Sequence, residues 1–201
     1  MKKFLHVGCG PAQKEHTTRT FASHDWQEIR FDIDARARPD IVGTMTDMAA
    51  VEDASVDAVF SAHNIEHLFP HEVPRALKEF LRVLKPDGFA VIACPDLQSV
   101  CALVSDGRLL EPAYISAAGP ISPMDILYGL RPALASGNHY MAHKCGFTEK
   151  VLATELFTAG FASVAHMRRA AAFDLWVLGA KTQMTSDTLG ELARSHFPVA
   201  A

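Results

Sequence analysis

Short apolar runs alternate with longer amphipathic stretches along most of this 201-residue chain. An apolar run of roughly four to eight residues is typical of a strand buried on both faces, whereas an apolar stripe with a helical period is typical of a helix lying on a sheet. Their repetition predicts βα units built around a parallel sheet. The length predicts one domain with room for a sizeable insertion.

The expected strands are apolar runs bounded by glycine, proline or acidic turns, and they cover residues 3–7, 28–33, 40–42, 55–62, 89–94, 161–167 and 173–180. The clearest expected helix covers residues 72–84, because its apolar side chains recur on one face. Pro74 suits the first turn of that helix. A second helix should follow a Thr148 cap, run to Ala159 and end at Gly160.

Two stretches depart from the alternation. Between the first two expected strands the chain is polar and weakly periodic, which leaves only a short or irregular crossover helix. Residues 97–146 show recurring proline and glycine and no strand-helix pair. We therefore expect one domain over residues 1–201, in which residues 97–146 form a cap or substrate-binding insertion. The tail after Lys181 should be peripheral.

Composition excludes several classes of protein. Hydrophobic residues make up 49% of the chain and charged residues 21%, which is ordinary for a folded domain. The net charge of -4 disfavours binding to nucleic acid. No apolar run reaches membrane-spanning length, and the N-terminus meets glycine and proline too early for a signal peptide. These features predict a cytoplasmic protein with no membrane partner.

We expect no metal site. The cysteines form no CxxC pair and are predicted to be free thiols, mostly buried: Cys9, Cys94, Cys101 and Cys145. The string from His63 to His67 matches the HxxEH of some zinc proteases, but that site needs both histidines on one uninterrupted helix. Here the string begins at a strand end and Pro70 follows it, so a polar loop that includes His71 is the more ordinary account.

The strongest local signal for a ligand is the glycine turn Gly8-Cys9-Gly10 after the first strand, where backbone amides can approach a ligand closely. Gln13 stands where a dinucleotide fingerprint has its third glycine, so a plain turn remains open on this evidence alone. Asp32 lies 22 residues after Gly10, at the end of the neighbouring strand, where a carboxylate can accept hydrogen bonds from a ribose. Together these features favour a nucleoside site.

The segments LHVGCGP, RFDID and SVDAVFSAHNIEHLFPHEVPRALKEFLRVLKPDGFAVIACPDL resemble class I S-adenosylmethionine-dependent methyltransferases, in the subgroup with "EHL" after the fourth strand and "RVLKPGG" before the fifth. The resemblance is close over residues 3–97 and loose over 147–181. It implies a Rossmann-like α/β fold: a mostly parallel seven-stranded sheet with an antiparallel last hairpin, and here a cap insertion before the last helix. It also implies S-adenosylmethionine as cofactor.

The resemblance implies a set of cofactor contacts. Gly8 and Gly10 would pass under the methionine and ribose, and Asp32 would bind the ribose hydroxyls. The adenine would lie between Asp47 and Met48, and the methionine end would be lined by Ala62, His63 and Asn64. The chain departs from the family at His6, where many relatives have an acidic residue, and in lacking a helix before the first strand.

The acceptor should be bound by the variable segment 97–146. It holds every tyrosine of the chain and several other polar residues: Tyr114, Tyr128, Tyr140, His139, His143, Asp125 and Arg131. A cavity wall made of phenol and imidazole groups suits a small polar molecule. His143 is the first candidate for a catalytic base and His139 the second, with Tyr128 as a further catalytic candidate beside them. The alternative is a segment that only caps the fold or forms a homodimer surface.

Other functions are weighed against this one. The loop after the fourth strand lacks the NPPY-like string of enzymes that methylate base or glutamine amino groups, which again disfavours nucleic acid. A non-catalytic protein of the same fold that binds S-adenosylmethionine or a nucleoside stays open, as does a nicotinamide-dependent oxidoreductase. The basic pair Arg168-Arg169 is expected to be solvated, or to bind a phosphate-bearing substrate.

Overall fold

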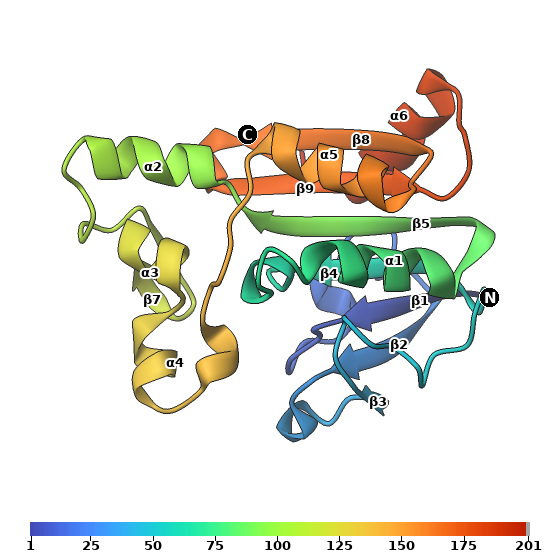
Figure 1. Ribbon diagram of the computed structural model, residues 1–201, viewed down its shortest axis with the longest axis horizontal. Helices are drawn as coiled ribbons and strands as arrows, with labels where there is room; N and C mark the ends of the chain where they lie inside the picture. Colours follow the sequence, from blue (N-terminus) through green and yellow to red (C-terminus); the bar gives the residue numbers. More distant parts are fainter. Residues whose placement is uncertain (200–201) are drawn as a thin grey trace.

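The computed structural model describes residues 1–199. Within them, one sheet is built from seven strands: β1 (Lys2–Val7), β2 (Trp26–Asp32), β3 (Ile41–Val42), β4 (Val56–Ala62), β5 (Leu84–Pro95), β8 (Ser163–Arg169) and β9 (Asp174–Ala180). Their order across the sheet is β3-β2-β1-β4-β5-β9-β8 (Figure 1). The pairings from β3 to β5 are parallel, whereas β9 runs antiparallel to both of its neighbours. The predicted mostly parallel sheet with an antiparallel last hairpin is confirmed.

The sheet changes its direction of growth between β1 and β4. Strand β1 pairs with β2 on one side and with β4 on the other, so that Leu5 lies beside Ile29 and Val59. The chain connections therefore leave in opposite directions on the two sides of this position. In open α/β sheets, such a switch point leaves a crevice at the carboxyl ends of the strands, where ligands bind. The glycine turn after β1 lies at this crevice.

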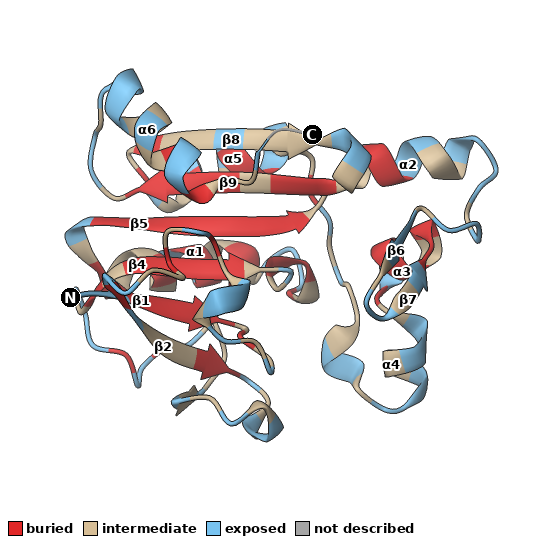
Figure 2. Cartoon of the chain, turned by 180° about the vertical axis from the view of Figure 1, so that it is seen from behind, coloured by how far each residue is buried: buried red, intermediate tan, exposed pale blue. Residues whose placement is uncertain are grey.

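Two helices cover one face of the sheet, α1 (Val73–Val83) and α5 (Glu149–Ala159). Leu77 of α1 and Leu152 of α5 are fully buried in the main core. Both helices lie where the sequence predicts them, and α5 ends at Gly160 in the left-handed conformation, with φ +116°. Figure 2 shows β1, β4 and β5 largely in red, the colour of buried residues. Across residues 1–199, no helix combines the length and apolar character required to cross a bilayer.

The chain after residue 181 forms a helix, α6 (Ser186–His196), that covers the opposite face. Its Leu189 and Leu192 pack against a buried cluster that includes Phe60 and Leu178 of the sheet. The prediction of a peripheral tail is therefore wrong. The many polar residues of this segment made it resemble a solvated tail, whereas it is an amphipathic helix that packs against a surface formed by strands distant in the sequence.

The connection between β1 and β2 holds one 3-10 turn, η1 (Lys14–His16), and no α-helix among its described residues. The predicted short crossover is confirmed. The rings of Phe21 and Phe4 stack with centroids 4.4 Å apart, and Trp26 meets Phe21 edge-on. Because this connection supplies no helix to the sheet face, these rings and α6 together exclude water from it.

The pH dependence of stability tests this docking of α6. Burial, together with the nearby Lys2, lowers the pKa of His196 from 6.5 to about 4. The unfolded chain therefore binds a proton that the folded chain excludes, so the free energy of unfolding should fall as pH drops from about 6.5 toward 4, with a limiting slope of about 1.4 kcal/mol per pH unit. A His196→Phe variant keeps an aromatic ring beside Phe21 and should lose this slope. Denaturant unfolding at several pH values measures it, and parallel pH profiles would contradict the docking.

Residues 97–146 are more regular than predicted. They form α2 (Leu97–Ser105), β6 (Tyr114–Ser116), β7 (Gly119–Ile121), α3 (Pro123–Tyr128), α4 (Arg131–Ala135) and the 3-10 turn η4 (His139–Met141). The hairpin of β6 and β7 is separate from the main sheet, and the segment has its own small core of Val100, Ile121 and Ile126. Figure 1 shows the insertion beyond the arrowheads of β1, β2 and β5. Its elements are too short to give a clear periodic signal.

Two buried carboxylates form ion pairs with the last two residues of β8, and one of them, Asp96, joins the base of the insertion to the last hairpin. Asp96 is fully buried, caps α2, and accepts a hydrogen bond from Arg168 Nε at 2.6 Å. Arg169 forms a bidentate ion pair with Asp174. The expected solvation of the Arg168-Arg169 pair is therefore wrong, because both guanidinium groups have carboxylate partners.

The four cysteines are free thiols, as predicted. Cys9 and Cys94 are buried, Cys145 is half-buried and Cys101 is exposed, so the expected burial holds fully for two of them. Burial raises the pKa of the Cys9 thiol, within the glycine turn, to about 11. Because the thiolate is the nucleophilic form, Cys9 is unreactive near neutral pH.

Candidate active site

The two glycines of the turn after β1 have different roles. Both have a left-handed backbone, with φ +66° at Gly8 and +50° at Gly10. A Cβ at Gly8 would lie 2.0 Å from Oδ1 of Asn64, whereas a Cβ at Gly10 would meet nothing within 4 Å. Gly8 is thus required by the packing of the protein itself. Gly10 leaves open space where a ligand can approach the backbone.

Asp32 holds this turn in place. One carboxylate oxygen accepts a hydrogen bond from Gly10 N at 2.7 Å, and the other accepts one from Asp34 N at 2.8 Å. The residue is 8% exposed, so it remains reachable from the crevice. Each oxygen keeps a second lone pair that can accept a ligand hydroxyl.

Arg30 also supports the turn, although the sequence pattern does not predict a role for it. From β2 its guanidinium donates to Gly10 O at 2.5 Å, Ala12 O at 3.1 Å and Arg38 O at 2.8 Å. It thereby ties the glycine turn to the segment after β2. A positively charged residue within a predicted strand was the available signal, but nothing local indicates which carbonyl groups it binds.

His6, which departs from the family pattern, is part of a buried pair. Its Nδ1 lies 2.6 Å from Oε1 of Glu28 on the neighbouring strand. The other Glu28 oxygen accepts a hydrogen bond from Lys14 N at 3.0 Å. The neighbouring strand β2 thus supplies a carboxylate beside His6.

A cleft of about 900 Å³ runs along the carboxyl ends of β1, β2 and β4. The residues predicted to contact cofactor that line this cleft are Gly8, Gly10, Asp32, Ala62, His63 and Asn64. Further lining residues come from the segment after β3 and from the insertion, namely Thr44, Met45, Asn138 and Tyr140. The fold therefore brings most of the predicted cofactor set to one surface.

The prediction for the adenine contacts is corrected at Met48. Its side chain is fully buried in the main core, so the thioether cannot face a ligand ring. Asp47 is exposed and lies outside the lining of the cleft. Thr44 and Met45, in the same loop, occupy the cleft wall instead. Both assignments depended on the register of a loop that the sequence pattern does not define.

His63 and Asn64 follow β4 directly. Asn64 Nδ2 donates to Val7 O at 3.0 Å and to Ala62 O at 2.7 Å, so it joins the ends of β1 and β4. His63 has a left-handed backbone with φ +56°, a strained conformation for a residue other than glycine. Its amide donates to Ala93 O at 2.8 Å, which fixes the residue at the rim of the cleft.

A second cavity of about 410 Å³ lies beside the cleft, between the insertion and the last hairpin. The cleft and this cavity share His63, His67 and Met141 in their walls. The predicted acceptor residues in its lining are Tyr114, Asp125 and His143. Asp125 is largely committed to an ion pair with Arg131, whose guanidinium holds the pKa of that carboxyl well below its usual range.

The other predicted acceptor residues lie elsewhere. Tyr140 lines the cleft, whereas Tyr128 is 59% exposed and borders only a smaller cavity of about 180 Å³ next to His143. His139 is exposed and lines none of these three cavities. The predicted wall of phenols and imidazoles is therefore divided between neighbouring spaces, and of the two candidate bases only His143 reaches one.

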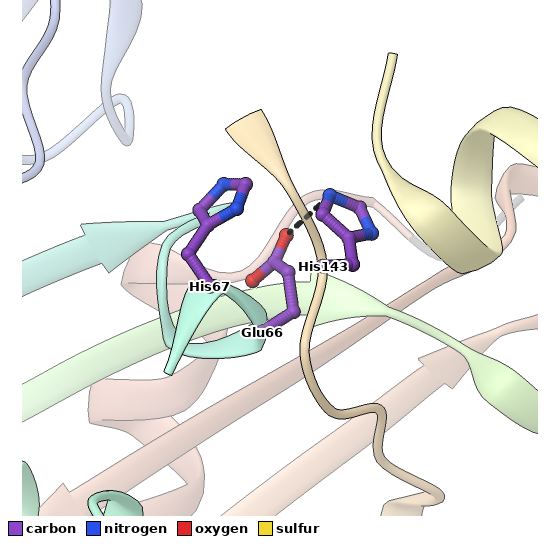
Figure 3. Close-up of side chains that lie close together, drawn as sticks. All are labelled: Glu66, His67 and His143. Atoms are coloured by element: carbon purple, nitrogen blue, oxygen red, sulfur yellow. Dashed lines mark ion pairs between the residues drawn. The ribbon is translucent and has the colours of Figure 1, made fainter. Parts of the chain in front are cut away.

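Backbone hydrogen bonds bring His143 next to the loop after β4. The amides of Lys144 and Cys145 donate to Glu66 O at 2.8 and 3.2 Å. Glu66 and His67 lie in the 3-10 turn η3 (Ile65–His67). Figure 3 shows the side chains of Glu66, His67 and His143 turned toward one another.

The HxxEH string does not form the zinc-protease site. Its residues span the end of β4 and one 3-10 turn rather than a continuous helix, as predicted. Its Glu66, however, is 1% exposed and lies at the centre of imidazoles. Burial alone would raise the pKa of this carboxyl, but the surrounding His63, His67 and His143 outweigh it and hold the pKa below its ordinary value. Glu66 is therefore a buried carboxylate.

With this geometry established, comparison with known proteins identifies the fold. Residues 5–92 match the sequence model of the family described as "Methyltransferase domain". This match and the sheet order support the resemblance to class I S-adenosylmethionine-dependent methyltransferases that the sequence predicts, and the solved structures below show the same fold. No curated protein matches the chain.

Several solved structures share the fold. A Thermotoga maritima protein described as a possible histamine N-methyltransferase aligns with a TM-score of 0.58 at 15% identity, over 90% of this chain and 83% of that one. A Methanosarcina mazei S-adenosylmethionine-dependent methyltransferase aligns with a TM-score of 0.59 at 17% identity, over 91% of this chain and 93% of that one. The Burkholderia thailandensis 1,6-didemethyltoxoflavin-N1-methyltransferase was solved with bound 1,6-didemethyltoxoflavin and S-adenosylhomocysteine. It aligns with a TM-score of 0.54 at 16% identity, over 90% of this chain and 72% of that one.

Proposed function

We propose that this protein transfers a methyl group from S-adenosylmethionine to a small polar molecule. The observation that carries the proposal is the glycine turn at the sheet's switch point, held by Asp32 and open above Gly10. A nucleoside with an attached amino acid needs this combination, because the ribose requires an acceptor of hydrogen bonds and the chain of the amino acid requires close approach to a backbone.

The residues of the cleft fit the cofactor in order. Asp32 would accept the ribose hydroxyls, and Gly8 and Gly10 would lie under the ribose and methionine. His63 and Asn64 would border the methionine end, and Thr44 and Met45 would take the adenine position first assigned to Asp47 and Met48. When bound, the cofactor supplies an activated methyl group on a sulfonium. The protein then has to align the acceptor with it and exclude water.

We place the acceptor in the second cavity, because its wall continues into the cleft at His63 and His67. His143 Nδ1 donates to Ile126 O at 2.7 Å, so Nε2 carries the free lone pair, and burial lowers the pKa of His143 below its usual value. A neutral imidazole can accept a proton or bind a metal ion. Tyr128 and His139 would take part only if the insertion closes further over the cavity.

Calorimetric titration tests the proposal. S-adenosylmethionine and S-adenosylhomocysteine should each bind in a saturable, one-to-one manner, whereas NAD should not bind. Release of S-adenosylhomocysteine in the presence of small hydroxylated or amino compounds would then separate an enzyme from a protein that only binds the cofactor. A folded protein that binds neither sulfur compound would overturn the proposal. The homodimer expected from the sequence stays a prediction, which the molar mass measured by light scattering tests.

A further inference from the structure

The carboxylate of Glu66 presents an unusual electrostatic problem. Both of its oxygens are buried, and neither has a hydrogen-bond partner among the described residues. Two imidazoles lie close to it, with His63 Nδ1 at 3.7 Å and His143 Nε2 at 4.0 Å from Oε1. A buried carboxylate without hydrogen bonds is costly, and a bound ion is one of the explanations for such an orphaned group in a folded protein.

His67 and His143 are arranged so that, with Glu66, they can act as metal ligands. One ligand atom from each of Glu66, His67 and His143 lies within 4.8 Å of the others. The bond from His143 Nδ1 to Ile126 O fixes the tautomer that leaves Nε2 free, and a carbonyl on the second ring nitrogen is the usual support of a metal-bound histidine.

His67 can supply a lone pair in the same way. Its ring nitrogens lie 3.1 Å from Ala142 O and 3.2 Å from His63 O. A neutral ring donates to only one of these carbonyl groups, so the other nitrogen keeps a lone pair, which a rotation of the ring would turn from the carbonyl oxygen toward the cluster. Two ligand atoms bound to the same metal ion are roughly 3 to 3.5 Å apart. Side-chain rotations that move the three ligand atoms by about 1 Å would therefore bring them to coordinating distance.

We propose that Glu66, His67 and His143 bind a divalent transition-metal ion. Two imidazoles and one carboxylate are typical of zinc, iron, cobalt and nickel sites, and they disfavour magnesium and calcium, which prefer oxygen ligands. Three protein ligands leave positions on the ion for another molecule. This proposal replaces the sequence expectation that the chain has no metal site.

The position of the ion suggests what it binds. His67 lies in the walls of both the cofactor cleft and the second cavity, and Glu66 and His143 line the second cavity. An ion held there would present its open positions to the space between cofactor and acceptor. If the proposed methyl transfer is correct, the ion orients an oxygen or nitrogen atom of the acceptor, and His143 acts as a ligand rather than as a base. Metal binding itself does not depend on that function.

Metal titration of the intact protein tests the site. Cobalt(II) and zinc(II) should each bind at one equivalent, and cobalt(II) should give a visible absorption band that zinc(II) abolishes. Glu66→Gln and His143→Ala should each weaken binding by about 100-fold or more, because loss of a direct ligand should cost at least as much as loss of its support. Glu66→Gln keeps the side-chain shape and removes a buried charge, so it should remain folded.

His71→Ala is the matched control. His71 is exposed, lies four residues after His67 and is outside the cluster, so its replacement should leave affinity unchanged. The proposal is overturned if neither metal binds stoichiometrically to the folded protein, if Glu66→Gln and His143→Ala bind as well as the unaltered chain, or if His71→Ala weakens binding equally. Titration with S-adenosylhomocysteine on the same samples reports cofactor binding separately from metal binding.

Discussion

Alanine at position 8 should destabilise the protein by about 2 to 5 kcal/mol. Its Cβ would lie 2.0 Å from Asn64 Oδ1, in a residue with φ +66°. Overpacking costs about 1 to 3 kcal/mol, and a left-handed backbone costs about 1 to 2 kcal/mol more for alanine than for glycine. Asn64 cannot move aside freely, because its amide joins the ends of β1 and β4. Denaturant unfolding measures the loss.

Gly10→Ala is the matched comparison. Its backbone is also left-handed, but the added Cβ meets no protein atom within 4 Å. Stability should therefore fall by only about 1 to 2 kcal/mol. Affinity for S-adenosylhomocysteine should nevertheless fall by about tenfold or more, because a steric cost of about 1.4 kcal/mol in the ligand space is already a factor of ten.

The two variants separate the two roles of the glycine turn. The expected pattern is a large loss of stability at position 8 and a loss of binding at position 10 in a protein that remains folded. Equal losses of stability at both positions would show that the turn is limited by backbone strain alone. Unchanged affinity in Gly10→Ala would place the cofactor elsewhere.

Asp32→Ala should weaken binding of S-adenosylhomocysteine by about 10- to 150-fold, which corresponds to about 1.5 to 3 kcal/mol for charge-assisted hydrogen bonds. The carboxylate both fastens Gly10 N at 2.7 Å and faces the cleft. Calorimetry on the folded variant gives the affinity. The loss combines the missing ribose acceptor with a looser turn.

Asp25→Ala is the control for a change of charge. Asp25 is exposed and forms an exposed pair with His24 remote from the cleft. Its replacement should leave affinity unchanged. If Asp32→Ala binds as tightly as Asp25→Ala, the ribose does not lie on Asp32, and the proposed orientation of the cofactor is wrong.

The sheet was predictable because its evidence is local. The apolar runs from Lys2–Val7 to Asp174–Ala180 carry their own periodicity, and the strands lie within about two residues of the expected ranges, apart from an earlier start of Leu84–Pro95. The glycine turn and Asp32 were predictable for the same reason, since each directly follows an apolar run. Glycine and aspartate at such strand ends have few structural alternatives.

Other features depend on partners far along the chain. Met48 entered the core instead of the cleft because the loop after β3 is held by tertiary contacts, such as the hydrogen bond from Met48 N to Glu79 Oε2 at 2.7 Å. The helix Ser186–His196 is amphipathic only with respect to a surface made by Phe21, Trp26 and the sheet. A peripheral tail and a docking helix have similar composition, so local pattern could not distinguish them.

The sequence by itself determined the order of the strands of the main sheet and of the helices α1 and α5, the turn at Gly8 and Gly10, and the acidic group at the end of β2, because each of these is encoded by residues adjacent in the chain. Only the tertiary structure decided that Glu66, His67 and His143 form one cluster. Glu66 and His143 stand far apart in the sequence, and hydrogen bonds from Lys144 and Cys145 to the carbonyl of Glu66 close that distance. The buried charge of Glu66 acquires meaning only when the imidazoles around it are known.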